Sequence, residues 1–140
     1  MNDFWVIPYL GMPGSIPCAI FTIGNKGGDL SMNFQQNKEF ISTIIREEFS
    51  SRNIVILEMI LFGSQSRGEA HRTSDWDFLI CIQEELGFRE KAKLKTSIQR
   101  RCAQKHIAVD IIIKSEEKMQ NERNNVGYIT YYAVKNGVPV

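Results

Sequence analysis

Residues 61–80 read LFGSQSRGEAHRTSDWDFLI, and this stretch decides how the rest of the chain is interpreted. One apolar run ends at Gly63-Ser64, and a second opens with Asp75-Trp76-Asp77. Aspartate is depleted in strands and is costly to bury without a partner, so packing alone does not explain a strand that opens with two aspartates. The pattern indicates a functional loop between two core strands.

The two aspartates are expected on one face of their strand. Side chains alternate across a strand, so Asp75 and Asp77 share a face while Trp76 points to the other. Neighbouring carboxylates repel unless a positive charge lies between them, and their hard oxygen atoms suit Mg²⁺ or Mn²⁺. The spacing therefore predicts a metal site at the start of this strand.

Gly63-Ser64 lies where the first strand is expected to turn into a short helix. Glycine lets the backbone approach a ligand closely, and a helix N-terminus offers free N–H groups to a phosphate. This loop would then hold the phosphates of a nucleotide while the following strand holds their metal ions. His71, in the same loop, is a further candidate contact to phosphate. The alternative interpretation is a surface turn with two solvated aspartates.

These residues carry a resemblance to a known family. Gly63-Ser64, followed after ten residues by Asp75-Trp76-Asp77, resembles the signature of the DNA polymerase beta-like nucleotidyltransferase superfamily. Three further residues match the pattern of its smallest members, the minimal nucleotidyltransferases: Arg67, Gly68 and Ser74. The resemblance covers roughly Ile54 to the C-terminus, and it implies an α/β (α+β) nucleotidyltransferase-like fold. Such a fold has a small mixed β-sheet with helices packed mainly on one face.

A third carboxylate, Asp110, lies in the apolar run 107–114, which is predicted to be a strand. A buried aspartate needs an opposite charge or a metal ion nearby, because an unpaired buried charge is costly. The superfamily carries a third carboxylate on a strand beside its Asp-x-Asp strand, and Asp110 matches that position. The alternative is a structural ion pair between Asp110 and an arginine.

The resemblance implies metal-dependent transfer of a nucleoside monophosphate, AMP from ATP, onto a hydroxyl group. Two Mg²⁺ ions, or Mn²⁺, would be bound by the catalytic carboxylates Asp75, Asp77 and Asp110, and Asp110 would also help to remove the hydroxyl proton. The nucleotide would be bound by four residues of the loop: Gly63, Ser64, Arg67 and Ser74.

Residues 1–36 are predicted to be an N-terminal extension of uncertain structure, and residues 37–140 the minimal nucleotidyltransferase domain. The domain is too short to carry an acceptor-binding domain of its own, so a partner is expected to bring the acceptor. Proteins of this shape resemble the antitoxin of toxin–antitoxin pairs, whose partner is a HEPN-type ribonuclease silenced by adenylylation of a tyrosine. Two alternatives stay open: a non-catalytic nucleotide-binding module that neutralises its partner by contact, and a transferase for a small molecule bound between subunits of a homo-oligomer.

Composition narrows the setting. The formal net charge of +1 predicts no overall attraction to nucleic acid or to anionic membranes. No apolar stretch is long enough to span a bilayer, and the first residues lack the basic region of a secretory signal, so a cytoplasmic protein is expected. The three cysteines are widely spaced and indicate neither a disulfide framework nor a zinc site.

Periodicity predicts the remaining elements. Strands are expected at residues 54–62, 75–83 and 107–114, and helices at residues 37–51, 65–71, 86–105, 115–125 and 127–136. Asn37 is the expected N-cap of the first helix, and Asn136-Gly137 the expected C-cap of the last. The apolar stripe of helix 86–105 is predicted to contain Phe88, Ala92, Leu94, Ile98 and Cys102. The rest of that helix is strongly basic, which indicates either a solvated face or a docking surface for RNA or an acidic partner. The last helix is expected to bury Tyr128, Ile129, Tyr132 and Ala133.

Overall fold

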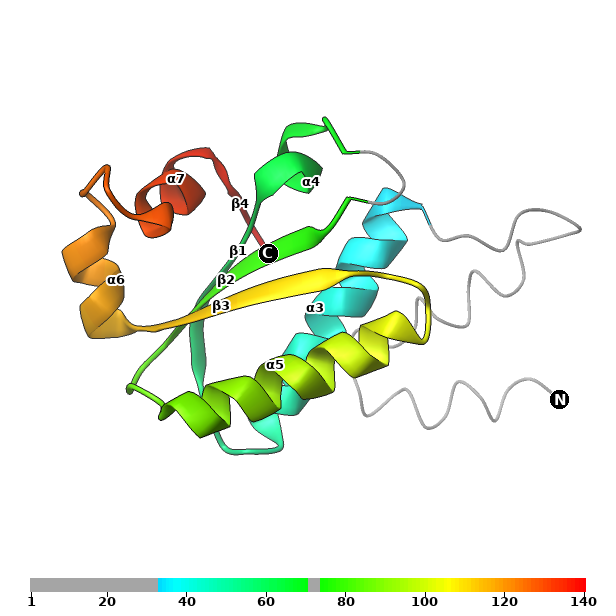
Figure 1. Ribbon diagram of the computed structural model, residues 1–140, viewed down its shortest axis with the longest axis horizontal. Helices are drawn as coiled ribbons and strands as arrows, with labels where there is room; N and C mark the ends of the chain where they lie inside the picture. The colour runs from blue at the N-terminus through cyan, green and yellow to red at the C-terminus, as the bar shows by residue number, and fades with distance from the viewer. Residues whose placement is uncertain (1–32, 71–73) are drawn as a thin grey trace, which may run out of the picture. The chain divides into compact units, whose positions relative to one another are not determined.

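The computed structural model of the protein describes residues 33–70 and 74–140 (Figure 1). The first 32 residues of the predicted extension, and His71, lie outside the described residues. The elements in chain order are α3 (Phe34–Ser50), β1 (Ile56–Phe62), α4 (Gly63–Arg67), β2 (Trp76–Ile82), α5 (Phe88–Ala103), β3 (Val109–Ser115), α6 (Glu116–Glu122), α7 (Ile129–Asn136) and β4 (Val138–Pro139). The chain divides into two compact units between Thr43 and Ile44, within α3, and the sheet belongs entirely to the second unit.

Four strands form one mixed sheet in the order β3-β2-β1-β4, as the α/β prediction requires. Strand β1 is antiparallel to β2 and to β4, whereas β2 and β3 are parallel. Parallel neighbours cannot be joined by a tight turn, so the chain crosses from β2 to β3 through α5. The strand order leaves β3 at one edge of the sheet, with β2 as its neighbour.

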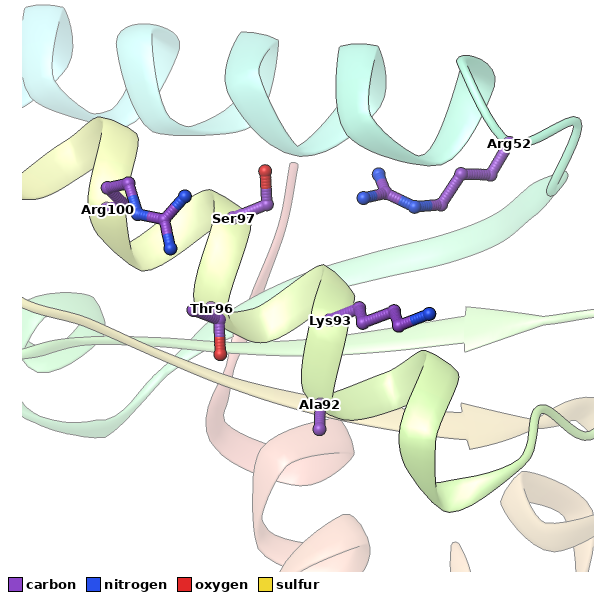
Figure 2. A pocket seen from close by; sticks show the side chains of 6 residues that line it. All are labelled: Arg52, Ala92, Lys93, Thr96, Ser97 and Arg100. Carbon is purple, nitrogen blue, oxygen red and sulfur yellow. The ribbon is translucent and has the colours of Figure 1, made fainter.

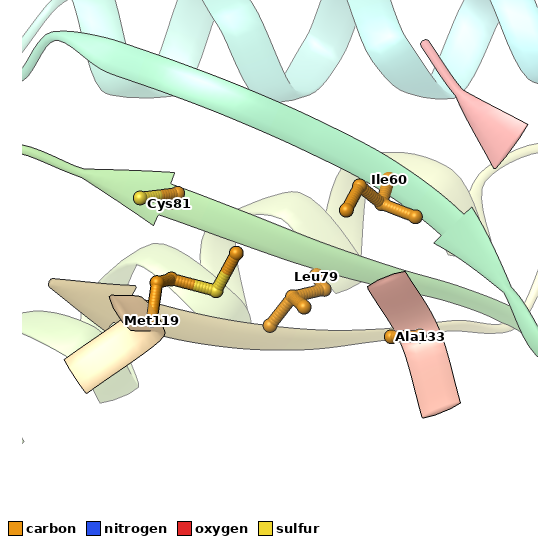
Figure 3. Close-up of a cluster of buried hydrophobic side chains, with 5 residues drawn as sticks. All are labelled: Ile60, Leu79, Cys81, Met119 and Ala133. Atoms are coloured by element: carbon orange, nitrogen blue, oxygen red, sulfur yellow. The ribbon is translucent and has the colours of Figure 1, made fainter. Parts of the chain in front are cut away.

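The two faces of the sheet are covered differently. Leu79 and Cys81 of β2 face the short helices α6 and α7, where they form a cluster with Ile60, Met119 and Ala133 (Figure 3). The alternate residues Phe78 and Ile80 are fully buried and face the other way, toward the side on which α5 lies behind the sheet. Strand β2 is therefore buried on both faces, except where Asp77 stands at its beginning.

Helix α3 begins three residues earlier than the sequence predicts, because a capping box and not Asn37 defines its start. The Asn33 side-chain oxygen accepts from the Gln36 N–H at 2.9 Å, and the Gln36 side-chain oxygen accepts from the Asn33 N–H at 3.0 Å. These reciprocal bonds satisfy two donors that a helix start would otherwise leave free. The prediction of Asn37 as the N-cap is wrong.

Helix α7 buries a different face from the predicted one. Tyr128, Ile129 and Tyr132 are about half exposed, and only Ala133 of the expected set is buried. The buried polar residue beside it is Thr130, whose hydroxyl donates to Glu122 Oε2 at 2.6 Å. Glu122 Oε2 also forms an ion pair with Lys114 Nζ at 3.0 Å. The helix therefore buries a polar group whose hydrogen bonds are satisfied, in place of an apolar side chain.

The apolar stripe of α5 is shorter than predicted. Leu94, Ile98 and Cys102 are fully buried at consecutive four-residue spacings, whereas Phe88 is 87% exposed and Ala92 is also exposed. Burial raises the pKa of the Cys102 thiol to about 11, which keeps it protonated and unreactive at neutral pH. Within the described residues, no helix is both long and apolar enough to cross a membrane.

Gly137 is the C-cap of α7, as predicted, but a close contact and not a left-handed backbone requires a glycine there. Its φ is −81°, which any residue adopts. A Cβ at this position would lie 2.3 Å from the Ala133 carbonyl oxygen and 2.4 Å from Ile60 Cγ2. The glycine therefore lets the chain pass close to β1 and pair with it as β4, a strand that periodicity did not reveal.

We expect Gly137→Ala to lower the free energy of unfolding by about 1–3 kcal/mol, because the added methyl group overpacks a contact made partly by backbone. Chemical denaturation monitored by circular dichroism would measure the loss. Gly87→Ala is the matched control, since nothing lies within 4 Å of a Cβ there. A control that loses as much stability as Gly137→Ala would contradict the close-packing explanation.

Candidate active site

The register of the parallel strands brings two of the predicted carboxylates together. Asp77 of β2 is the direct register partner of Asp110 of β3, so both side chains emerge on the same face of the sheet. Asp75 lies just before β2, two residues from Asp77, and its negative charge acts on Asp77. The face shared by Asp77 and Asp110 is the α6 and α7 face, but Asp77 lies at the end of β2 beyond the apolar cluster. The position expected for Asp110, on a strand beside the Asp-x-Asp strand, is confirmed by this register.

The electrostatics of Asp77 show how closely these groups interact. Its pKa is raised above the ordinary value of 3.8, first by burial and then by the negative charges of Asp110 and Asp75. The positive charge of Arg67 acts in the opposite direction and only partly offsets them. The site therefore carries an excess of negative charge around one half-buried carboxylate.

Gly63 touches this carboxylate directly. Its φ is +76°, and a Cβ built on it would lie 2.3 Å from Asp77 Oδ2. Strand pairing places the preceding residue, Phe62, opposite Asp77, so the glycine passes over the aspartate as the chain leaves β1. The sequence prediction gave this glycine a role in approaching a phosphate. The structure adds a second reason, which is room for the Asp77 side chain.

A buried amide ties the two ends of the loop together. Gln65, only 8% exposed, donates from Nε2 to the Ser74 carbonyl oxygen at 3.2 Å. Ser66 Oγ donates to the Gly63 carbonyl oxygen at 2.8 Å, and Gly68 closes α4 in a left-handed conformation at φ 72°. Sequence reasoning missed Gln65, because no pattern distinguishes a buried glutamine from an exposed one.

The other predicted nucleotide-binding residues lie around the same carboxylate. Ser64 is half-buried at the start of α4, and its carbonyl oxygen accepts from the Glu69 N–H at 3.1 Å. Arg67 is half exposed and pairs with Glu69, with Nε 3.0 Å from Oε2. Ser74 is half-buried and joined to α4 through Gln65. The structure places these residues near Asp77, whereas their roles toward a nucleotide stay predictions.

Asp110 has a different environment from the one predicted. Its side chain is 51% exposed, because β3 is an edge strand, and its partner is a lysine instead of an arginine. Lys95 Nζ of α5 lies 3.7 Å from Asp110 Oδ1, and the same oxygen accepts from the Ile111 N–H at 3.0 Å. A long side chain from the opposite face thus reaches round the edge of the sheet to this carboxylate.

The donor set fits a divalent cation, although it is not yet arranged around one. In the described ranges, no three carboxylate, imidazole or thiol groups already stand in a metal-binding arrangement. Asp110 instead directs Oδ1 to Lys95 and to its own strand. The three aspartates supply only hard oxygen atoms, and the pKa of Asp77 is raised by burial and then by the neighbouring negative charges, which a cation would offset. Rotation of the exposed Asp110 side chain away from Lys95 is the adjustment required.

Comparison with known proteins identifies the family and the fold. The nucleotidyltransferase domain family matches residues 42–136. A mutant of the toxin–antitoxin MntA-HpeT is similar in structure, with a TM-score of 0.51 and 18% sequence identity over 77% of this chain and 72% of that chain. A structure described as a minimal nucleotidyltransferase has a TM-score of 0.52 and 18% identity over 80% of this chain and 100% of that chain. At these identities the likeness establishes the fold. No curated protein matches the chain.

Gly63→Ala should disturb the site more than Gly68→Ala, although both glycines have positive φ values, of 76° and 72°. Each alanine would be strained by about 1–2 kcal/mol in the left-handed conformation, so both variants should lose stability for the same reason. Only the methyl group at residue 63 meets Asp77, whereas nothing lies within 4 Å of a Cβ at residue 68. Mn²⁺ binding, followed by electron paramagnetic resonance, should weaken in Gly63→Ala alone. Equal weakening in both variants would remove the contact as the cause.

Asp77→Asn should raise the melting temperature of the metal-free protein at pH 7 by a few degrees. A raised folded-state pKa means that the favourable contribution of Asp77 is complete below its ordinary pKa of 3.8 and is lost as the pH rises through the raised value. Asparagine keeps the uncharged form at every pH, so the gain should shrink toward acid. Thermal unfolding with a chelator present would measure it. Glu84→Gln, at an exposed carboxylate just beyond β2, should change little. A destabilised Asp77→Asn protein would contradict the repulsion.

Proposed function

Because the chain belongs to the nucleotidyltransferase domain family, we propose that it transfers AMP from ATP to a hydroxyl group of a partner protein. The observation that carries this proposal is the pairing of Asp77 with Asp110 in the β2–β3 register, with the Gly63 backbone against Asp77. Two carboxylates held side by side at the end of a sheet, beside a glycine-led loop, supply the groups that metal-assisted transfer of a nucleotidyl group needs.

Each residue has a role that follows from its position. Asp75, Asp77 and Asp110 would hold two Mg²⁺ ions, or Mn²⁺, which supply electrostatic stabilisation of the charge on the phosphorus centre. Ser64 would donate its hydroxyl to the terminal phosphates, and the Arg67 guanidinium would offset their charge. Ser74 would support the loop from its other end, where Gln65 already holds it.

Asp110 is suited to act on the acceptor, because it is the exposed carboxylate at the edge of the sheet. The acceptor oxygen would form a bond to the α-phosphorus, and the bond from that phosphorus to the bridging oxygen would break to release pyrophosphate. The hydroxyl proton would pass to the Asp110 carboxylate as the new bond forms. A carboxylate open to solvent on one side can receive a hydroxyl carried on a macromolecule.

The proposed acceptor is a tyrosine of a HEPN-type toxin, with this chain as the antitoxin. A structurally similar protein belongs to the toxin–antitoxin MntA-HpeT, which supports the assignment by analogy with a related fold. The exposed carboxylate at the sheet edge supports a protein acceptor independently of that analogy.

A second candidate function is neutralisation of the partner by contact alone, with nucleotide as a bound but unreacted ligand. The Lys95–Asp110 ion pair favours this candidate, because a lysine that stayed on Asp110 would occupy the oxygen that catalysis requires. The two candidates differ in whether the label of ATP is transferred, so one experiment separates them.

We expect incubation with α-labelled ATP, Mg²⁺ and the product of the neighbouring gene to place label on a tyrosine of that product. Asp77→Asn and Asp110→Asn should each lower the transfer rate by at least about 100-fold while keeping the circular dichroism spectrum, because each removes an oxygen ligand and little packing. Glu84→Gln is the matched control and should transfer normally. Tight binding without label would favour neutralisation by contact, and label on a small molecule alone would favour the small-molecule transferase.

A further inference from the structure

The basic residues of α5 separate into two sets. Three of them are paired within the protein: Lys91 with Glu85, Lys95 with Asp110, and Arg101 with Glu47 and Glu48. Arg89, Lys93 and Arg100 are exposed and form no ion pair in the part of the chain that the structure describes. The positive charge that α5 offers to another molecule therefore comes from the second set.

Part of this second set lines a groove beside the end of α3 (Figure 2). Lys93, Thr96, Ser97 and Arg100 follow one another at the spacing of a single helix face. Arg52 stands across from them, and its side chain extends from the turn after α3 toward α5. The groove has a volume of about 420 Å³ and is completed by Ala92. Its lining offers cations and hydroxyl groups, and no carboxylate is among the described residues that line it.

Glu48 contacts two of the lining residues, Arg52 and Ser97, and its carboxylate oxygen atoms are already occupied. Glu48 accepts from Arg52 NH1 and from Ser97 Oγ, each at 2.8 Å, and from Arg101 NH1 at 3.0 Å. Burial alone would raise the pKa of Glu48, but these hydrogen bonds outweigh it and hold the pKa below the ordinary value. Glu48 thus fixes the guanidinium of Arg52 at the groove and leaves Lys93 and Arg100 without a partner.

We propose that this groove docks an acidic segment of the protein that accepts the nucleotide, an inference that rests on the proposed function. The lining favours a short acidic peptide over a nucleic acid. No aromatic ring is among the lining residues to stack against a base, and a net charge of +1 gives no long-range attraction to a phosphate backbone. The chain's own first 32 residues are a poor ligand, because their only acidic residues are Asp3 and Asp29.

The position of the groove suits an acceptor. Lys95 lies on the same helix as Lys93 and Arg100, and it reaches Asp110 round the edge of β3. The helix that lines the groove therefore also reaches the carboxylates at the edge of the sheet. A partner whose acidic segment lies along α5 can present a hydroxyl group at the sheet edge without entering the protein.

The test measures binding of two fluorescein-labelled probes by anisotropy: a ten-residue peptide of alternating Glu and Ser, and a ten-nucleotide oligouridylate RNA. We expect the full chain to bind the peptide more tightly than the RNA, and raised salt to weaken this binding. Lys93→Glu and Arg100→Glu should each weaken peptide binding by about tenfold, because each replaces an attraction at the groove by a repulsion. Lys105→Glu makes the same change of charge on an exposed lysine outside the groove, and it should bind as the wild type does.

Three results would overturn the inference: no binding of the peptide, tighter binding of the RNA, or equal weakening by Lys105→Glu. The transfer assay separates this inference from the proposed function. Groove variants should raise the KM for the protein acceptor while leaving the affinity for ATP unchanged. Transfer with an unaltered KM would contradict docking at the groove and support the proposed transferase activity. Peptide binding that depends on Lys93 and Arg100, without transfer to any partner, would contradict the transferase activity and support docking at the groove.

Discussion

The position of Asp77, which the strand register holds beside a second carboxylate, is the constraint on which the described site depends. The parallel pairing of β2 and β3 sets Asp77 beside Asp110, and Asp75 adds a third negative charge. Parallel pairing requires a crossover, which α5 provides, and α5 in turn supplies the lysine that lies on Asp110. The antiparallel pairing of β1 with β2 leaves Gly63 no space for a side chain, because it sets the glycine against Asp77. The crossover, the glycine and the counter-charge thus follow from the way the neighbouring strands pair with β2.

The sequence predicted those parts of the fold that depend on short-range periodicity and on spacing. Alternation along β2 was enough to place Asp75 and Asp77 on one face, and the apolar run around Asp110 was enough to predict a neighbouring strand. The exposure of Asp110 was not predictable, because it follows from the order of strands in the sheet, which leaves β3 at the edge. The strand β4 was missed for a similar reason. Its two residues are too few to show a period, and its cause, the approach of Gly137 to Ile60, joins distant parts of the chain.

Polar residues with distant partners account for most other differences. Thr130 is fully buried because Glu122 accepts its hydroxyl, and Glu122 in turn holds Lys114, so the apolar pattern of this helix did not reveal its buried face. Arg101 illustrates the same difficulty for charge. Its partners Glu47 and Glu48 lie more than fifty residues earlier, and a count of basic residues along α5 could not show which of them the protein had already neutralised. The start of α3 is different, because its cause is local. Asn33 and Gln36 have the spacing of a capping box, so the sequence could have prevented this error.

Lys95 connects the carboxylate site with α5, the helix that lines the basic groove. While it lies on Asp110 it supplies part of the positive charge that the carboxylates lack, at the distance of a solvent-exposed ion pair, which contributes little to stability. A divalent cation at the carboxylates would replace that weak interaction, because a doubly charged ion with several oxygen ligands outweighs one exposed ammonium group. The released ammonium group would then add to the positive charge of α5, on the helix where an acidic partner is proposed to dock. Loading of the site and attraction of the partner would thus favour each other, since any coupling between two binding events is reciprocal.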